Sequence, residues 1–241
     1  MLYAVLSDVH GNLEALQAVL DEIGPSRELL CLGDIVGYGP NPNECLDLLK
    51  ARKVLMVLGN HDVAAIDDFG MSYFSDLARE AMRWTQSVIA KEHVAWLNTL
   101  SYELRMPAFL LVHGAPVRYF EYCKNVEVAR RAFGATDAPL IFVGHTHVAE
   151  YYALAPDERI VNQHMQFGGE LLLESKYRYI VNVGSVGQPR DLNPQASYVL
   201  YDPEAGRVTW KRVPYPIDLV VEKMGAAELP QALGERLYNG R

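Results

Sequence analysis

Residues 2–10 read LYAVLSDVH, and this stretch decides the fold that we predict. Residues 2–7 are an apolar run typical of a strand, and Asp8 and His10 follow where that strand should end. Apolar side chains then recur at helical spacing over residues 12–23. The stretch therefore predicts a buried strand that presents two polar side chains just before a helix.

The same order of strand, polar turn and helix repeats along the first half of the chain. Residues 29–32 form a second apolar run, which ends at Gly33-Asp34. Residues 54–58 form a third, which ends at Gly59-Asn60-His61-Asp62, and a helix is predicted between the two runs. Alternating strands and helices are typical of βαβ units in an α/β fold.

A helical segment and two further strands precede a change in composition near residue 150. Residues 72–100 read as helical, and residues 109–113 and 140–144 read as two further buried strands. Short strands separated by Gly and Pro turns then cover residues 150–213, before one or two C-terminal helices. No Pro/Ser-rich linker separates the halves. We therefore predict a single domain of residues 1–241, with an α/β (mixed α+β) fold: a four-layer sandwich of two facing mixed β-sheets flanked by helices.

Composition narrows the classes of protein. The chain has 241 residues, 50% of them hydrophobic, and a net charge of −8, which argues against a stable nucleic-acid partner. Its three cysteines show no CxxC spacing, so a zinc ribbon is not indicated. No apolar run approaches the ~20 residues of a membrane span, and no signal peptide is visible. We expect a cytoplasmic protein with no membrane partner, and the sequence leaves the oligomeric state open.

Polar side chains follow five successive predicted strands. In an open α/β sheet, ligands bind beyond the carboxyl ends of the strands. Carboxylate, amide and imidazole groups suit divalent ions such as Mn, Fe, Co, Ni and Zn. Each motif alone could be a turn or a hydrogen-bonded core histidine, as we interpret His93 and His164, but five in order predict a metal site. The candidate ligands are Asp8, His10, Asp34, Asn60, His113, His145 and His147.

These five motifs resemble those of the calcineurin-like metallophosphoesterase superfamily. Residues 182–190, which read NVGSVGQPR, resemble its small bacterial and archaeal phosphodiesterase branch. The resemblance implies two divalent metal ions per chain, with manganese as the first choice and iron, zinc, nickel or cobalt as alternatives. It implies that His61 is the catalytic acid that protonates the leaving oxygen. The implied ligands are Asp8, His10 and His147 for the first metal, Asn60, His113 and His145 for the second, and Asp34 for both.

The second motif departs from the serine/threonine protein phosphatases. Their pattern continues Gly-Asp-x-x-Asp-Arg-Gly, whereas residues 33–39 here read GDIVGYG. Gly37 replaces the aspartate that orients the catalytic histidine, and Tyr38 replaces the arginine that holds phosphate. This difference argues against that branch and leaves open what orients His61.

We therefore predict a binuclear metal-dependent hydrolase of phosphate esters, in which a hydroxide bridging the metals attacks phosphorus. A phosphodiesterase acting on a small phosphorylated substrate or a nucleotide is the preferred interpretation, and a phosphomonoesterase of the same fold is the alternative. A non-catalytic scaffold would fit eroded ligands, but His10 and His61 are both present. A DNA nuclease would need a basic extension. Arg190 is a candidate phosphate contact or a surface ion-pair residue, and other substrate-binding residues are not identified.

Overall fold

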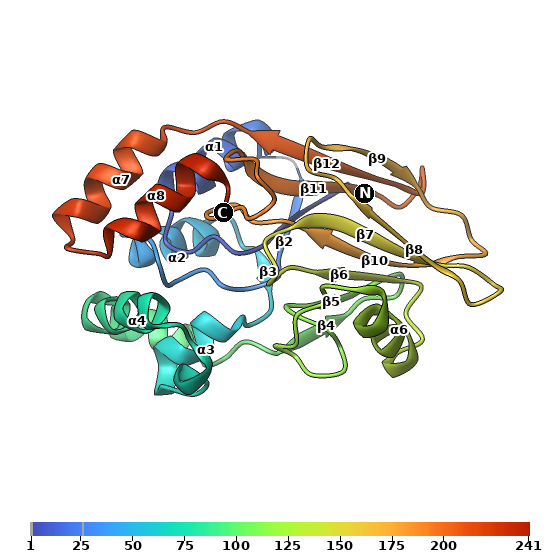
Figure 1. The fold of residues 1–241 in the computed structure, drawn as a ribbon, viewed down its shortest axis with the longest axis horizontal. Coiled ribbons are helices and arrows are strands. Elements are labelled where there is room, and N and C mark those ends of the chain that lie inside the picture. The colour runs from blue at the N-terminus through green and yellow to red at the C-terminus, as the bar shows by residue number, and fades with distance from the viewer. Residues whose placement is uncertain (1, 26) are drawn as a thin grey trace.

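Residues 2–25 and 27–241 are described by a computed structural model of the chain (Figure 1). The first half contains β1 (Tyr3–Leu6), α1 (Leu13–Ile23), β2 (Glu28–Cys31), α2 (Pro42–Ala51), β3 (Leu55–Met56), α3 (Asn60–Asp67), a 3₁₀ turn η1 (Met71–Tyr73), α4 (Asp76–Val88), α5 (Lys91–Leu97), β4 (Glu103–Arg105) and β5 (Leu110–Val112). The second half contains α6 (Val126–Ala135), β6 (Leu140–Val143), β7 (Ala149–Leu154), β8 (Ile160–His164), β9 (Gly169–Leu172), β10 (Arg178–Val183), β11 (Ala196–Asp202), β12 (Arg207–Val213), α7 (Ile217–Ala226) and α8 (Gln231–Asn239).

The strands form two mixed sheets of six strands each. Their orders are β3-β2-β1-β11-β12-β9 and β4-β5-β6-β10-β7-β8. The strands β1, β2 and β3 are parallel in the first sheet, and β5, β6 and β10 are parallel in the second. Tyr3 of β1 pairs with Tyr201 of β11, so the first sheet is built from both halves of the chain.

Alternation along the strands creates three hydrophobic layers. Ala4 and Leu6 point toward the helices that cover the first sheet, whereas Val5 between them points toward the second sheet. In β6, Phe142 belongs to the core between the sheets and Ile141 packs with α6 on the outer face. Figure 1 shows the two sheets stacked with helices outside them, which confirms the predicted four-layer sandwich.

Most predicted elements are present, with shifts at their ends. β3 is shorter than predicted, because only Leu55 and Met56 pair regularly. Four elements were not predicted from the sequence: α3, α6, β4 and β8. In α6 the signal was available, since Asn125 caps the helix and its buried residues recur at helical spacing. β8 is largely exposed and β4 has three residues, so neither produces a clear apolar pattern.

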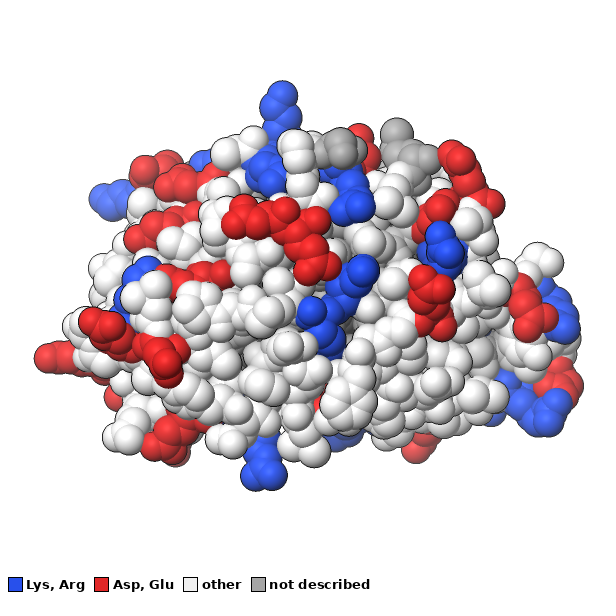
Figure 2. Space-filling model, turned by 90° about the horizontal axis from the view of Figure 1, so that it is seen from above, with Lys and Arg blue, Asp and Glu red and all other residues white. Residues whose placement is uncertain are grey.

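The surface carries charge of both signs. Figure 2 shows acidic and basic side chains interspersed over the described part of one face, without a broad basic area there. In the part of the chain that the structure describes, no helix is long and apolar enough to cross a membrane.

Candidate metal centre

The ends of parallel strands from both sheets meet at one place. Asp8 and His10 follow β1, and Asp34 follows β2 in the first sheet. His113 follows β5, and the loop after β6 carries His145. The backbone N–H of His145 donates a hydrogen bond to Asp8 Oδ2 at 3.0 Å, which joins the two sheets. The site therefore lies where the carboxyl ends of strands from both sheets meet.

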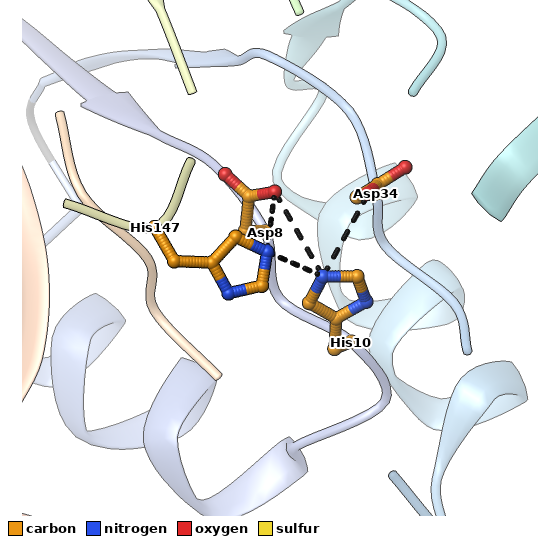
Figure 3. A group of neighbouring side chains, drawn as sticks. All are labelled: Asp8, His10, Asp34 and His147. Carbon is orange, nitrogen blue, oxygen red and sulfur yellow. Dashed lines mark hydrogen bonds and ion pairs between the residues drawn. The ribbon is translucent and has the colours of Figure 1, made fainter. Parts of the chain in front are cut away.

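One group contains Asp8, His10, Asp34 and His147, all buried (Figure 3). One potential ligand atom from each lies within 4.8 Å of the others. Asp8 Oδ1 lies 3.1 Å from His147 Nε2, and Asp34 Oδ2 lies 3.7 Å from His10 Nε2. The group combines two carboxylates with two imidazoles, a donor set suited to a divalent transition metal.

A second group contains Asp34, His113 and His145. Asp34 Oδ2 lies 3.3 Å from His113 Nε2, which lies 3.1 Å from His145 Nδ1. Asn60 Oδ1 is buried, and none of the described residues gives it a hydrogen-bond partner. Asp34 belongs to both groups. The two buried clusters are consistent with a binuclear divalent metal site.

Backbone carbonyls orient all four imidazoles of these groups. Since a carbonyl can only accept a hydrogen bond, the ring nitrogen beside it must carry the hydrogen. Nδ1 of His10, His113 and His147 donates to Val36 O, Leu32 O and Gln188 O, at 3.1, 2.8 and 2.6 Å respectively. Nε2 of His145 donates to Phe120 O at 3.1 Å. In a neutral ring, the other nitrogen is then left with a lone pair facing the centre, as metal ligation requires.

The two buried carboxylates of the centre favour positive charge at His113. Burial lowers the pKa of His113, but the charge of Asp34, a hydrogen bond to Asp34 and the charge of Asp8 outweigh burial and raise the pKa to about 9. Without a metal, His113 therefore holds a proton at neutral pH. A divalent cation can supply that charge instead, so the residues present fit the metal ions that the resemblance implies.

The backbone of five candidate ligands has positive φ. Values from 50° to 66° are found at Asp8, His10, Asp34, His145 and His147. A backbone conformation in a sparsely populated region costs roughly 1–3 kcal/mol per residue, so the surrounding contacts must hold these residues in it. Strain concentrated at these positions is typical of a functional site.

Asp62 holds the loop that carries Asp34. Its carboxylate accepts backbone N–H groups from Asp34 at 2.7 Å, Ile35 at 2.9 Å and Gly59 at 3.0 Å. Gly59 is required because an added Cβ would lie 2.0 Å from Asp34 Oδ1. Asp62 thus holds the backbone around the site, and its carboxylate forms no hydrogen bond with His61 Nδ1, which has no partner among the described residues.

Residues 182–190 form hydrogen bonds with the backbone and side chains around both clusters. Asn182 Nδ2 donates to Gly144 O at 2.8 Å, next to His145. Ser185 Oγ donates to Asp8 O at 2.8 Å, and Gln188 O accepts the His147 hydrogen. The segment therefore positions metal-site backbone and one imidazole, a role that spacing alone could not reveal.

His61 is oriented by packing rather than by a carboxylate. Its backbone N–H donates to Asp34 Oδ1 at 2.8 Å, and its ring lies 4.6 Å from Tyr38 and 4.5 Å from Phe74. A Cβ on Gly37 would lie 2.3 Å from His61 Nδ1, so glycine leaves room for this placement. Burial, opposed by the charge of Asp34, lowers the pKa of His61 to about 4.

An open cleft of about 1020 Å³ adjoins the centre. Its wall includes Asn60, His61, His145 and Arg190. The Arg190 guanidinium lies 5.7 Å from the ring of Tyr38 and donates to Gln188 Oε1 at 2.8 Å. Arg190 is thus part of the cleft and not a surface ion-pair residue.

The two histidines interpreted as ordinary residues lie outside both clusters. His93 is buried in α5, with Nε2 3.3 Å from Asp47 Oδ1. His164 lies on the exposed strand β8.

Comparison with known proteins agrees with this site. Residues 1–206 match the calcineurin-like phosphoesterase superfamily domain. A metallophosphoesterase from Sphaerobacter thermophilus shares the fold with a TM-score of 0.90 and 41% identity, over 100% of this chain and 99% of that chain. An uncharacterized protein of Methanocaldococcus jannaschii is 37% identical, over 100% of this chain and 98% of its own length.

Family and site together define a metal-dependent phosphoesterase. The chain belongs to the calcineurin-like phosphoesterase superfamily, as the sequence motifs indicated. A hypothetical protein of Pyrococcus horikoshii is 20% identical with a TM-score of 0.79, over 100% of this chain and 98% of that chain, and shows the same fold.

Proposed function

We propose that this phosphoesterase hydrolyses phosphodiesters of small molecules or nucleotides. The cleft of about 1020 Å³ beside the metal centre is the observation that supports this substrate class. A phosphate group needs only a small part of that volume. A substituent on each side of phosphorus can therefore be accommodated while the phosphate lies at the centre.

In this proposal, Asp8, His10 and His147 hold one divalent ion. The other is held by Asn60, His113 and His145, with Asp34 shared, because Asp34 belongs to both clusters. When bound, the two ions would supply positive charge to the phosphate oxygens and lower the pKa of the attacking water. The mixed oxygen and nitrogen donor set makes manganese our first choice, with iron, zinc, nickel or cobalt as alternatives.

His61 donates a proton to the leaving oxygen in this proposal. Its Nδ1 faces Gly37, which leaves Nε2 to exchange a proton with the substrate. Burial keeps the ring neutral in the free protein, but a bound phosphate brings negative charge that favours the protonated form. Tyr38 and Phe74 hold the His61 ring in place by packing, without a hydrogen bond from the ring to a carboxylate.

A diester is favoured over a monoester by the charge around the cleft. A monoester carries up to two negative charges at neutral pH, whereas a diester carries one. Tyr38 stands where the serine/threonine protein phosphatases have an arginine. Its ring packs against the guanidinium of Arg190. Because Tyr38 carries no charge, this position adds no cation to those of the cleft wall, which favours the single charge of a diester over the two charges of a monoester.

We also infer that residues 1–241 form one domain. The core between the sheets contains Val5 and Leu30 from the first half together with Val181 and Trp210 from the second. Separating the halves would expose this shared apolar surface to water.

The test is a substrate panel on metal-free protein reconstituted with Mn, Fe, Zn, Ni, Co or Mg. Phosphodiesters, phosphomonoesters and nucleotides are compared by kcat/KM. We expect diesters to be hydrolysed at least as well as monoesters with one or more metals. Activity confined to monoesters would replace this proposal by the phosphatase alternative.

A further inference from the structure

The cleft beside the metal centre is unusually aromatic. Eight of its 18 lining residues are Phe or Tyr, whereas aromatic residues are 10% of the whole chain. Tyr73, Tyr102 and Tyr119 are exposed by 92%, 39% and 40%. Exposed aromatic rings gathered in one concave place indicate a binding surface rather than a core.

These rings form a continuous series from the centre to the solvent. The His113 ring lies 6.2 Å from Phe120, which lies 5.9 Å from Tyr102. Tyr102 stacks on Tyr119 at 5.2 Å, with 11° between the ring planes. On another part of the wall, Phe74 contacts His61. A flat group attached to a phosphate at the centre would therefore meet aromatic rings along its path.

Three arginines lie in the same wall. Within the described chain, Arg118, Arg190 and Arg236 form no ion pair with a carboxylate, although the net charge is −8. The one carboxylate of the lining, Glu121, pairs with Arg131 outside it. The cleft therefore combines stacking surfaces with cations that no described carboxylate neutralises and that can bind phosphate or other anionic oxygens.

We propose that the cleft is a nucleotide-binding subsite, in which the base stacks on the Tyr102–Tyr119 pair and the arginines contact anionic oxygens. This inference rests on the proposed function, since it places the scissile phosphate at the metal centre. Stacking accepts any base because every base has a π-face, so the subsite selects nucleotides without reading their sequence. A simple aryl phosphate also has an aromatic ring but lacks the ribose. Comparing its affinity with that of a nucleotide distinguishes the two kinds of ligand.

Binding is measured by calorimetry on manganese-reconstituted protein with adenosine 5′-monophosphate, phenyl phosphate and ribose 5-phosphate. The nucleotide should bind roughly 5- to 150-fold more tightly than ribose 5-phosphate, the range that stacking of one base provides. It should also bind more tightly than phenyl phosphate. The doubly substituted Tyr102→Ala, Tyr119→Ala protein should lose most of the preference. Phe167→Ala, the control, removes an exposed ring outside the cleft and should retain the preference for the nucleotide.

Equal affinities for nucleotide and ribose 5-phosphate would overturn the inference. Affinity for phenyl phosphate equal to that for the nucleotide would overturn the assignment to nucleotides. Hydrolysis of methyl 4-nitrophenyl phosphate, measured on the same protein, tests the proposed function separately. Hydrolysis without a nucleotide preference leaves the phosphodiesterase proposal standing and removes only the subsite.

Discussion

The Nε2 atoms of His10 and His147 lie 3.1 Å apart, and in the neutral rings neither carries a hydrogen. Nδ1 of each ring donates to a backbone carbonyl, which fixes the tautomer. Burial lowers the pKa of both imidazoles, so both are neutral near pH 7. Two lone pairs at this distance repel one another, and a cation between them turns the repulsion into ligation.

Removing metal should therefore destabilise the fold. A site at 100 times its Kd contributes about 2.7 kcal/mol, so two sites correspond to a fall in Tm of roughly 10–20 °C on chelation. Calorimetry before and after chelation, with manganese added back, measures this change. In Asp34→Asn, chelation should lower Tm by less than in the wild-type protein. The same Tm with and without chelator would contradict a structural contribution of the metals.

Metal content should separate the roles of Asp34 and Asn60. Elemental analysis should find about two metals per wild-type chain. Asp34→Ala should lose both because Asp34 belongs to both clusters, and Asn60→Ala should mainly weaken the second. If Asp34→Ala kept both ions at wild-type affinity, the shared role would be wrong.

Filling the second site should release a proton. The pKa of His113 is raised to about 9, so its ring is protonated in metal-free protein below that pH and must deprotonate to bind metal. Metal affinity should rise with pH up to about 9 and level off above it. Calorimetry in buffers of different ionisation enthalpy should show about one proton released from this group at pH 7. No proton release would count against His113 as a ligand.

Gly37→Ala should displace His61 without removing the metals. The new Cβ would lie 2.3 Å from His61 Nδ1, and the φ of +86° adds strain of about 1–2 kcal/mol. Gly24→Ala is the matched control, because its φ is +74° and a Cβ there meets nothing within 4 Å. Both variants should lose stability in thermal unfolding because of the positive φ, and Gly37→Ala should lose more because it also clashes with His61. Only Gly37→Ala should lose kcat. Equal activity losses would show that the effect is general strain.

His61→Ala tests proton donation separately from metal binding. An activated nitrophenyl ester leaves as a stable phenolate and needs little protonation, whereas an alkyl or ribose ester leaves as an alkoxide. The variant should keep two metals and lose more rate on the alkyl ester, with acid catalysis of ~10²–10⁴-fold setting the scale. Equal losses of rate on the two esters would show that His61 positions the substrate and does not donate the proton.

The order of motifs at strand ends was readable because strand and turn propensities act between neighbours along the chain. The apolar run that became β1, followed by Asp8 and His10, needed no distant contact to be recognised. The same reasoning missed α3, whose first residues Asn60 and His61 read as a turn motif rather than as a helix start. It also left open what orients His61.

By itself, the sequence determined which side chains stand at the ends of the strands and predicted that they bind metal. The tertiary structure alone decided how they meet. The pairing of Tyr3 with Tyr201, the carbonyl of Gln188 on His147 and the packing of Tyr38 against His61 join residues through the folded chain. These contacts form only when the two sheets pack face to face. Local sequence patterns do not show that packing, because they reflect interactions between residues that are close together in the chain.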